Sequence, residues 1–598
     1  MNFAAIIHEA KSNLAYAYDK ETLHVRIKTG KNEVKNIEIL AVDPFNWIPR
    51  KDGSGIYDFD IASVYKIKME KEQITRDHDC WFAEIKDIKW RRIKYCFILE
   101  NDKEKYIYGS HYRHPYTEDK DRLYDLSNYF NYPYINEEDL YKAPDWVENT
   151  VWYQIFPKSF YGGEKSKEGT LQGIIEKLDY IKEAGFNGIY LNPIFESPSQ
   201  HKYDTTDYFK IDKELGDNDT FKRLVEEAHR RGIKVMLDAV FNHCGFNHPY
   251  WQDVVKNGKK SKYFNCFYVL NPNKPIVAGE IINGKPQAVA REELNYFTFA
   301  YTQSMPKWNT SNPIAREYLL KVASYWVEKY DIDGWRLDVS NEVSHDFWRE
   351  LRKRLKAIKP SLYILGENWD NSYPWLRGDQ FDAVMNYEFS RPIWSCFRLN
   401  NKEKMKYSLE DLKVELSRLL VSYPKHLTRN LFNLLDSHDT ERFFSLVQKR
   451  VELAKLAYLI LLTFPGSPSI YYGSEIGMTG GEHTNRQPMI WEEDKQNKEL
   501  FSFIKKLIQL RKKYESFRSE NLSWIELDGL DNVLSYKKKG REEDLYVILN
   551  MDEKNKKFSL PEEMRNLKLR DCLEDKELLL DSEIELFPYD YKIYLLKK

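Results

Sequence analysis

The sequence lacks the features that would assign the protein to a membrane, a metal centre or a nucleic acid. No apolar stretch is long enough to span a bilayer, and the most apolar helical run, Leu456–Phe464, predicts a buried core element. The six cysteines are scattered without a C-x-x-C pair, which argues against a zinc site and a disulfide framework. The 91 Lys and Arg residues nearly balance the 93 Asp and Glu residues, so no large field favours nucleic acid or an anionic membrane. The first residues also lack the pattern of a signal peptide, and we expect a cytoplasmic protein with reduced thiols.

Aromatic residues, in contrast, are abundant. They make up 15% of the chain, with 42 Tyr and 15 Trp. Such a content fits an aromatic-rich core, and it also fits stacking on sugar rings, since aromatic faces suit the C–H faces of a pyranose. Composition alone leaves both interpretations open.

Apolar patterning divides the 598-residue chain into parts, as expected for a length that exceeds one hydrophobic core. Residues 1–130 contain several short alternating segments bounded by turn residues, which predict an N-terminal β-sandwich. Residues 131–148 are rich in Tyr, Asn and Pro and predict a linker. Alternating segments return in residues 518–598, which predict a small C-terminal β-sandwich.

The middle part, residues 149–517, alternates short apolar runs with amphipathic helical stretches. Eight runs predict strands, namely VWYQIFP, FNGIYLNP, IKVMLDAV, IDGWRLDV, YILGENW, FDAVMNYEF, NLLDSHD and SPSIYYG. Eight β/α units in series are typical of a (β/α)8 TIM barrel. Residues 244–309 lie between the third and fourth strands and are too many for an ordinary loop, so they predict an inserted subdomain.

Acidic residues follow several of these strands at the end where TIM barrels place their active sites. Asp338 follows the fourth strand, Glu367 the fifth and Asp439 the seventh, so three carboxylates should converge on one pocket. Arg336 lies two residues before Asp338 and should face the same way. Any one of these residues alone would more often be structural, but the ordered combination R-x-D, G-E and H-D is hard to attribute to chance.

This set of residues suits hydrolysis of a glycosidic bond. A retaining enzyme needs an ionised nucleophile and a protonated acid roughly 5–5.5 Å apart. The charge of Arg336 should keep Asp338 ionised, and the neighbouring carboxylates should push a proton onto Glu367. His243 and His438 are expected to donate hydrogen bonds to sugar hydroxyls or to charge at the reacting centre.

Four further residues carry weaker expectations. Tyr203 is expected to stack on a sugar ring, with Asp204 near the same hydroxyls. Asp238, at the end of the third strand, fits a role in loop geometry and a role in binding equally well. Asp436 fits a structural role better.

Four segments match, in order, the conserved regions of the α-amylase superfamily, glycoside hydrolase family 13. They are DAVFNH, GWRLDVSNE, GENWD and NLLDSHDT. The resemblance implies that Asp338 is the nucleophile, Glu367 the acid/base and Asp439 the stabiliser of the transition state. It also implies that three residues line the subsite where the sugar is attacked, namely Arg336, His243 and His438.

A closer resemblance is to the neopullulanase, cyclomaltodextrinase and maltogenic amylase subgroup. It rests on GIYLNPIFESPSQHKYDTTDYF, MPKWNT and FPGSPSIYYGSEIGMTGG, and on NLAYAYDKETLHVRIKT, which is similar to the subgroup's starch-binding-like N-terminal sandwich. The resemblance implies a cytoplasmic enzyme that hydrolyses cyclodextrins, maltooligosaccharides and pullulan, with transglycosylation. It also implies a homodimer in which one protomer's N-terminal domain covers the partner's active site. Glu342 matches a position linked to water handling and transfer, and Phe299 matches a substrate-contacting aromatic.

The chain departs from the subgroup in two places. The loop after the first strand, KSFYGGEKSKEGTLQG, lacks the Asn and Asp residues that bind calcium in relatives. We therefore expect that site to be lost and no metal or other cofactor to be needed. Asn368-Trp369-Asp370 stands where the subgroup commonly has Ile-Trp-His, which alters the expected acceptor-side subsite.

Two alternatives remain. One is another enzyme of the same superfamily: an α-1,6-glucosidase, a trehalose-forming isomerase or a simple maltose hydrolase, against which the N-terminal sandwich counts. The other is a non-catalytic binding or partner subunit. Such a subunit would be expected to lack at least one of the three acids, and all three are present.

Overall fold

The computed structural model describes the chain apart from residues 164–167, 400–406, 483, 528–529, 561–563, 566 and 580–582. Internal contacts divide the chain into two compact units. The first contains Met1–Lys142 with Tyr407–Thr428, and the second contains Ala143–Lys406 with Arg429–Lys598. The helices of residues 407–428, which the sequence analysis assigned to the barrel, thus pack with the N-terminal strands.

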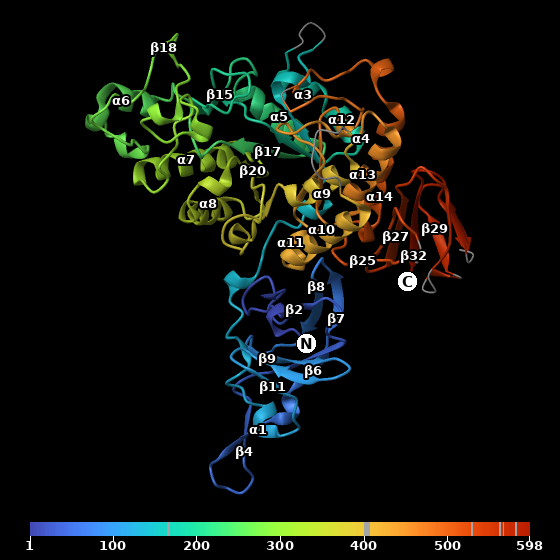
Figure 1. The fold of residues 1–598 in the computed structure, drawn as a ribbon. Helices are drawn as coiled ribbons and strands as arrows, with labels where there is room; N and C mark the ends of the chain where they lie inside the picture. The colour runs from blue at the N-terminus through green and yellow to red at the C-terminus, as the bar shows by residue number, and fades with distance from the viewer. Residues whose placement is uncertain are drawn as a thin grey trace. The chain divides into compact units, whose positions relative to one another are not determined.

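The N-terminal unit is built on two antiparallel sheets (Figure 1). The first has four strands, in the order β1 (Ala15–Ala17), β2 (Leu23–Gly30), β8 (His78–Ile85) and β7 (Glu70–Ile74). The second has β11 (Arg113–Pro115), β10 (Lys105–Tyr108), β9 (Ile93–Glu100), β3 (Asn36–Val42) and β6 (Tyr65–Lys68), with β12 (Phe130–Tyr132) also paired to β9. The predicted N-terminal sandwich is confirmed, and its last strand extends into the predicted linker.

Alternation along these strands explains the core of the N-terminal unit. Val25 and Ile27 of β2 and Ile39 of β3 point inward and are fully buried, as the period of two residues in a strand requires. Helices α10 (Leu409–Ser422) and α11 (Lys425–Thr428) belong to the same unit. They are joined to it by Arg26, whose guanidinium donates to the carbonyl of Tyr423 at 2.6 Å.

The second unit contains an eight-stranded parallel sheet closed into a barrel (Figure 1). Its strands are β13 (Trp152–Ile155), β14 (Gly188–Leu191), β17 (Lys234–Ala239), β20 (Gly334–Leu337), β21 (Tyr363–Gly366), β22 (Ala383–Val384), β23 (Phe432–Leu434) and β24 (Ser467–Tyr471). A parallel bridge between Met385 and Phe432 joins the two ends of the sheet, and the Asn386 amide donates to the Phe432 carbonyl at 2.8 Å. The predicted TIM barrel is confirmed, and each of its eight predicted strands overlaps one of these strands.

Local sequence explains the alternation of strands and helices in the barrel. Helix α5 (Asn218–Arg230) begins at Asp217, whose carboxylate accepts from the amide of Thr220 at 2.7 Å. Its apolar stripe is buried and consists of Phe221, Leu224, Val225 and Ala228. Helix α4 (Leu178–Ala184) ends at Gly185, whose φ of 104° suits glycine. These signals set the lengths of the β/α units and so place the strand ends at one mouth.

The insert between β17 and helix α7 (Pro313–Tyr330) has an aromatic core of its own. Helix α6 (Pro249–Asn257) buries Trp251 against the ring of Phe267 at 4.8 Å, and Phe267 stacks on Trp308 at 4.6 Å. The short hairpin of β18 (Ile281–Ile282) and β19 (Lys285–Pro286) is exposed. Part of the high aromatic content therefore packs the protein interior.

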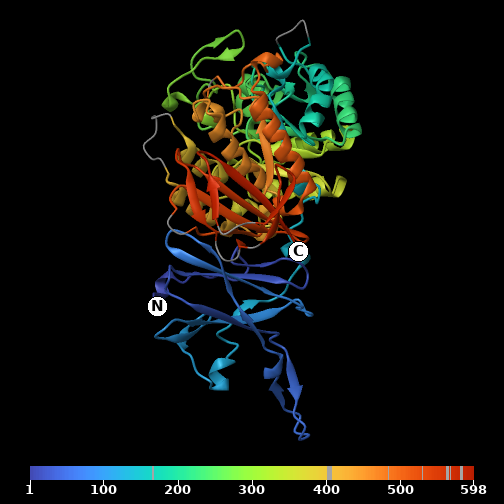
Figure 2. The same ribbon diagram turned by 90° about the vertical axis from the view of Figure 1, so that its right-hand side faces the viewer.

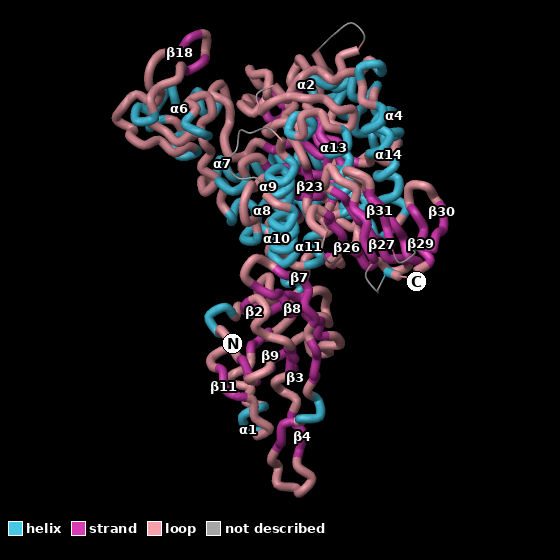
Figure 3. Tube along the Cα trace, turned by 45° about the vertical axis from the view of Figure 1, so that its right-hand side comes forward, coloured by secondary structure: helices cyan, strands magenta, loops and turns pink. Residues whose placement is uncertain are grey.

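The chain ends in a second antiparallel domain, drawn in red in Figure 2. Its strands are β25 (Leu522–Trp524), β26 (Val533–Lys539), β27 (Glu543–Asn550), β32 (Tyr591–Lys597), β29 (Lys568–Asp571) and β30 (Lys576–Leu579), with a separate pair of β28 (Lys556–Ser559) and β31 (Glu583–Leu586). Figure 3 shows several of these strands gathered near the C-terminus. The predicted C-terminal sandwich is confirmed. Among the described helices, none is both long and apolar enough to cross a membrane.

Candidate active site

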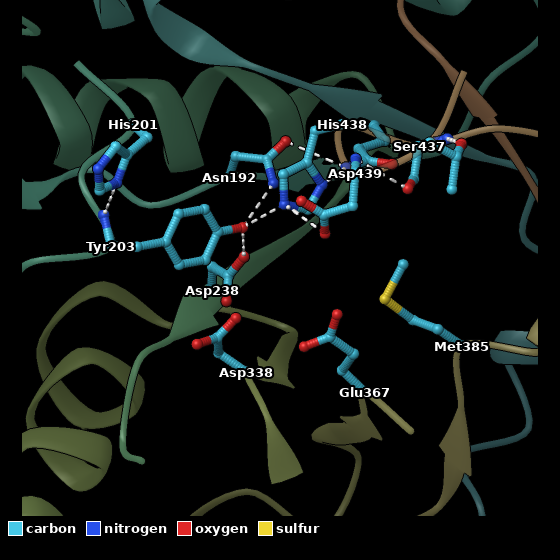
Figure 4. Close-up of polar contacts among 12 residues, drawn as sticks. Asn192, His201, Tyr203, Asp238, Asp338, Glu367, Met385, Ser437, His438 and Asp439 are labelled. Atoms are coloured by element: carbon cyan, nitrogen blue, oxygen red, sulfur yellow. Dashed lines mark hydrogen bonds and ion pairs between the residues drawn. The ribbon is translucent and has the colours of Figure 1, made fainter. Parts of the chain in front are cut away.

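Three carboxylates meet at the mouth of the barrel. Asp338 directly follows β20, Glu367 directly follows β21, and Asp439 lies in the loop after β23. Figure 4 shows their side chains directed into one space. The carboxyl ends of parallel strands meet at one face of a barrel, so this convergence follows from the topology.

One guanidinium joins the two central acids. Arg336, on β20, places Nη1 2.7 Å from Oδ1 of Asp338 and Nη2 2.8 Å from Oε1 of Glu367. The contact with Asp338 is a hydrogen bond, and the contact with Glu367 is an ion pair without hydrogen-bond alignment. The terminal nitrogens of one planar group contact both acids, so the two carboxyls lie across a short gap. Arg336 is completely buried, which makes it a fixed charge at the base of the site.

A strained residue supplies a further contact to Glu367. Val339, immediately after Asp338, has φ 46° and ψ 43°, a left-handed conformation that is unfavourable for a β-branched side chain. Such strain costs about 1–3 kcal/mol and persists only where its surroundings enforce it. It directs the Val339 amide to Oε2 of Glu367 at 2.9 Å. Backbone strain therefore ties the residue after one acid to the carboxyl of the other.

Burial raises the pKa of the aspartates in this cluster. The pKa of Asp338 lies well above its ordinary value because of burial and the nearby Glu367 and Asp238, and Arg336 only partly offsets this. Burial, with the charge of Glu367, raises the pKa of Asp439 to about 7. Burial and the neighbouring acids thus oppose the charge of Arg336, which is expected to keep Asp338 ionised. The cluster retains protons near neutral pH.

Asp238, at the end of β17, holds the base of the cluster together. Its carboxylate accepts from Arg336 Nη1 at 2.9 Å, from the Tyr190 hydroxyl at 2.6 Å and from the Tyr203 hydroxyl at 3.0 Å. Of the two roles considered for it, these contacts match the role in local geometry. Asp436 has a structural role as expected, since it accepts from the amide of Phe443.

Tyr203 faces His438. Its ring stacks on that of His438 with centroids 5.5 Å apart and planes 6° apart, and its hydroxyl lies 2.5 Å from Nε2 of His438. Its neighbour Asp204 is held away from this contact, since its carboxylate accepts from the hydroxyls of Ser197 and Ser199. The structure thus brings Tyr203 to the carboxylate cluster but places Asp204 in a local serine network.

His438 is a neutral hydrogen-bonding group. Burial lowers its pKa well below the ordinary value. Its Nδ1 accepts from Nε2 of Gln154 at 2.8 Å, so its proton lies on Nε2, which is 3.0 Å from Oδ2 of Asp439. Arg486 holds the other oxygen of Asp439 at 3.1 Å and the carbonyl of His438 at 3.0 Å. Asp439 is therefore fixed from both sides.

His243 and Phe299 form a second wall. Their rings stack with centroids 5.1 Å apart, and Phe299 is half-buried in the short helix η8 (Phe299–Tyr301). Burial lowers the pKa of His243 to about 3, so this histidine is neutral as well. Its Nε2 donates to the carbonyl of Tyr203 at 3.1 Å. His243 thus supports the Tyr203 loop in addition to any contact with a ligand.

Glu342 lies farther from the cluster, in the short helix η9 (Ser340–Glu342) that follows Val339. Its side chain is half-exposed, and Oε2 lies 3.1 Å from Nζ of Lys307. Its nearest partner is thus a cation from the insert rather than one of the three acids.

Several residues of this site were missed by the sequence analysis, namely Gln154, Tyr190, Asn192, Lys307 and Arg486. Gln154 and Asn192 are polar residues within or directly after apolar strand runs, and this is the signal that would have found them. Asn192 donates to the Tyr203 hydroxyl at 3.1 Å. Arg486 and Lys307 lie in long loops and carry no such signal.

The segment after Glu367, Asn368-Trp369-Asp370, contributes one ring of an aromatic pair. Trp369 stacks on Tyr387 with centroids 3.7 Å apart and planes 4° apart, and its indole N–H donates to Oε1 of Glu367 at 3.3 Å. Asp370 pairs with Arg391 at 2.7 Å on the surface. Trp369, which is also present in the Ile-Trp-His pattern, therefore contacts the second acid, whereas the altered residue Asp370 pairs with a surface cation.

No group of three or more metal-ligating acids, histidines or cysteines occurs among the described residues. In the loop expected to have lost calcium, residues 164–167 lie outside the described part. The described part of that loop presents the ammonium of Lys158, which lies 2.7 Å from Glu168 and 3.2 Å from Glu214. A fixed cation at this place does not fit a cation site.

Comparison with known proteins agrees with this geometry. Residues 154–497 match the family model of the α-amylase catalytic domain, and residues 1–136 match that of the α-amylase N-terminal Ig-like domain. A barrel with this cluster at its mouth, in a chain that matches these models, defines a glycoside hydrolase. The chain belongs to the α-amylase family.

Three curated relatives and one solved structure are similar over nearly the whole chain. A cyclomaltodextrinase of Geobacillus thermopakistaniensis (strain MAS1) is 42% identical over 99% of both chains. An intracellular maltogenic amylase of Bacillus subtilis (strain 168) is 39% identical over 99% of both chains. Neopullulanase 2 of Thermoactinomyces vulgaris is 36% identical over 92% of this chain and 91% of the relative. A solved structure of a cyclomaltodextrinase matches with a TM-score of 0.89 and 35% identity over 100% of both chains. The expected subgroup is confirmed.

Proposed function

We propose that this chain is a retaining α-glycoside hydrolase that cleaves cyclodextrins, maltooligosaccharides and pullulan and also transfers glycosyl groups. Asp338 is the nucleophile, Glu367 the general acid/base and Asp439 the stabiliser of the transition state. The observation that carries the proposal is the contact of one buried guanidinium, that of Arg336, with both Asp338 and Glu367. A short gap between two carboxyls is the arrangement that retaining hydrolysis requires.

The reaction divides between these residues as follows. Glu367 donates its proton to the glycosidic oxygen while Asp338 attacks the anomeric carbon, which forms a covalent glycosyl–enzyme and releases the leaving sugar. Glu367 then takes a proton from water, and the resulting hydroxide displaces Asp338. A sugar hydroxyl in place of water gives transfer. Asp439, held by His438 and Arg486, places negative charge beside the positive charge that develops on the ring.

Neutral donors and aromatic rings complete the proposed sugar site. His438 and His243 are uncharged by burial, and Tyr203 and Phe299 each stack on one of them. Neutral hydrogen-bonding groups next to ring faces suit a pyranose, which is uncharged and has both hydroxyls and C–H faces.

The stereochemistry of the first product tests the mechanism. Proton NMR of early hydrolysis of maltotetraose should show the α-anomer first, with mutarotation to the β-anomer following. Initial release of the β-anomer would exclude a retaining reaction and with it the nucleophilic role of Asp338.

The product profile tests the substrate class. β-Cyclodextrin, pullulan and maltotriose should all be hydrolysed. Survival of β-cyclodextrin together with cleavage of isomaltose would instead favour the α-1,6-glucosidase alternative, and formation of trehalose would favour the isomerase. The names of relatives that match 99% and 92% of the chain, a cyclomaltodextrinase and a neopullulanase, support the first outcome.

We further propose a homodimer formed through the N-terminal unit. That unit exposes large apolar side chains in loops and in the hairpin of β4 (Trp47–Pro49) and β5 (Tyr57–Phe59), where Trp47 and Tyr57 are about half exposed. Phe45 and Trp90, each 68% exposed, flank the guanidinium of Arg92. Aromatic and arginine side chains of this kind are enriched in interfaces. Sedimentation equilibrium should show a dimer, and F45S with W90S should shift it to monomer.

The chain is also proposed to work without calcium, because Lys158 supplies a fixed positive charge in the first loop. Dialysis against EDTA should leave kcat and Tm unchanged, and loss of activity that calcium restores would contradict this.

A cytoplasmic location is proposed from the intracellular relative and the six buried free cysteines. Fractionation of expressing cells tests it.

A further inference from the structure

Lys307 joins the two sides of the barrel mouth. It lies in the last segment of the insert, where its backbone bridges that of His243 and its amide donates to the carbonyl of Phe297 at 2.9 Å. Its side chain leaves this segment and reaches across to the turn that follows Asp338. There Nζ lies 3.0 Å from the carbonyl and 3.1 Å from the carboxylate of Glu342.

The same ammonium also donates to the side chain of Asn242, which follows β17. An ammonium has three N–H donors, and these three oxygens can accept all of them. Asn242 is a fixed anchor, because it is fully buried and its amide nitrogen lies 3.3 Å from Nδ1 of His243. The side chain of Lys307 is only 17% exposed, and an apolar replacement would leave the buried side-chain oxygen of Asn242 without this donor.

The turn that Lys307 holds is the strained one. It begins at Val339, whose left-handed conformation directs its amide to Oε2 of Glu367. Ser340 secures the start of the turn, since its hydroxyl donates to the carbonyl of Glu367 at 2.6 Å. Lys307 secures the end of the turn at Glu342. A strained turn persists only while both ends are held, and its relaxation would move the Val339 amide away from Glu367.

Building on the function proposed above, we propose that Lys307 is a positioning residue that clamps the turn of residues 339–342 to Asn242 and thereby holds Glu367 in place for proton donation. The residue acts through Val339 and does not itself touch the reacting atoms. Its function is therefore specific to the steps in which Glu367 transfers a proton, namely protonation of the leaving sugar and deprotonation of the attacking water.

Leaving-group dependence tests this specificity. The sugar released from β-cyclodextrin must be protonated by the acid, whereas the fluoride of α-maltosyl fluoride leaves without protonation. K307M should lower kcat on β-cyclodextrin about 10- to 100-fold, a large part of what general acid catalysis contributes, with KM changed less than about threefold. On α-maltosyl fluoride the pre-steady-state burst of fluoride release, which reports formation of the glycosyl–enzyme alone, should retain at least about one third of the wild-type rate in the same variant. K307R, which keeps the cation, should recover much of the lost activity on β-cyclodextrin.

Two further variants separate the proposed effect from a general loss of folding. K259M removes an exposed lysine of the same insert, whose ammonium contacts only Asn273 among the described residues, and should leave both activities unchanged. K307Q is a second neutral replacement if K307M does not fold, and the same selectivity is expected of it. An equal loss in the rate of the fluoride burst and in kcat on β-cyclodextrin in the folded variant would overturn the proposal, as would unchanged activity on β-cyclodextrin. Failure of the wild-type chain to hydrolyse β-cyclodextrin would instead count against the proposed function itself.

Discussion

Two aspartates at opposite ends of strand β20 have opposite electrostatic surroundings. Asp333 precedes the strand and Asp338 follows it, and both are buried. Asp333 accepts from His229 at 2.7 Å and lies 3.0 Å from Lys234 and 3.1 Å from Lys359. Burial alone would raise its pKa, but this hydrogen bond and these cations outweigh it, so the pKa of Asp333 is lowered. Asp338 instead shares one cation with other acids, and its pKa is raised.

The difference separates stability from chemistry along a single strand. At the closed end of the barrel, several cations surround one acid, which is the arrangement that stabilises a fold. At the open end, several acids surround one cation, which is unfavourable for the fold but leaves protons available near neutral pH. The carboxyl end of a barrel strand carries function, and the amino end carries stability.

The largest expected effect comes from removing each aspartate in turn. D338N should lower kcat by about 10⁴-fold or more, because the nucleophile is lost, while the protein remains folded. D333N should leave kcat within about twofold but lower the free energy of unfolding by about 2–4 kcal/mol, because it removes the buried charge that pairs with Lys234 and Lys359. Activity assays paired with urea denaturation of both variants measure this. Equal loss of activity in the two variants would contradict the assignment of catalysis to Asp338 and of stability to Asp333.

The next effect concerns the acid limb of the pH profile. Arg486 lowers the pKa of Asp439, which burial has raised to about 7. Asp439 must be ionised to stabilise the transition state, so R486M should move the acid limb of kcat/KM to higher pH and lower kcat/KM about 10- to 100-fold at pH 6. The matched variant K359M, at the other end of the barrel, should leave the pH profile unchanged. An unshifted acid limb in R486M would show that Arg486 does not act through Asp439.

A smaller effect is expected in the pH dependence of stability. Asp439 has a folded pKa above its unfolded value of about 3.9, so it destabilises the fold increasingly as the pH rises from about 4 to 7. D439N should therefore be more stable than the wild type at pH 8, and the difference should shrink toward pH 5. Asp333 has a lowered pKa, so its contribution is complete above about pH 4 and is lost below it. D333N should be less stable by the same amount from pH 5 to 8. If the stability difference from the wild type changed with pH in the same way in D439N and D333N, the proposed electrostatic difference between the two aspartates would be wrong.

The smallest effect is expected for His229. H229Q removes one of the hydrogen bonds to Asp333 and leaves Lys234 and Lys359 in place. It should cost about 1 kcal/mol of stability, with no change in kcat. A change in kcat without a change in stability would indicate that the two ends of the strand are coupled.

The sequence predicts the barrel strands and the acids at their carboxyl ends better than it predicts the residues that surround those acids. Each strand of the barrel is a short apolar run flanked by turn residues, so all eight were found, and the acids that directly follow them were placed correctly at the mouth. The carboxyl ends of the strands meet because of the barrel topology, so their convergence can be predicted without knowledge of side-chain contacts. The N-terminal strands alternate with a period of two residues and were predicted for the same reason.

The remaining features depend on contacts that no local pattern reveals. Arg486 and Lys307 come from long loops and reach the mouth only in the folded chain. The raised pKa of Asp338 depends on its burial and on how many acids share the charge of Arg336, and neither can be counted from the sequence. The grouping of α10 and α11 with the N-terminal strands rests on contacts between segments that are far apart in sequence, such as Arg26 with Tyr423.

Trapping of the covalent intermediate tests the central claim most directly. Incubation with 5-fluoro-α-maltosyl fluoride, followed by proteolysis and mass spectrometry, should place the sugar on the peptide that contains Asp338. No label should appear on that peptide in D338N. An adduct on Glu367 or Asp439, or turnover by the wild-type protein with no adduct at any time, would contradict the assignment of Asp338 as the nucleophile.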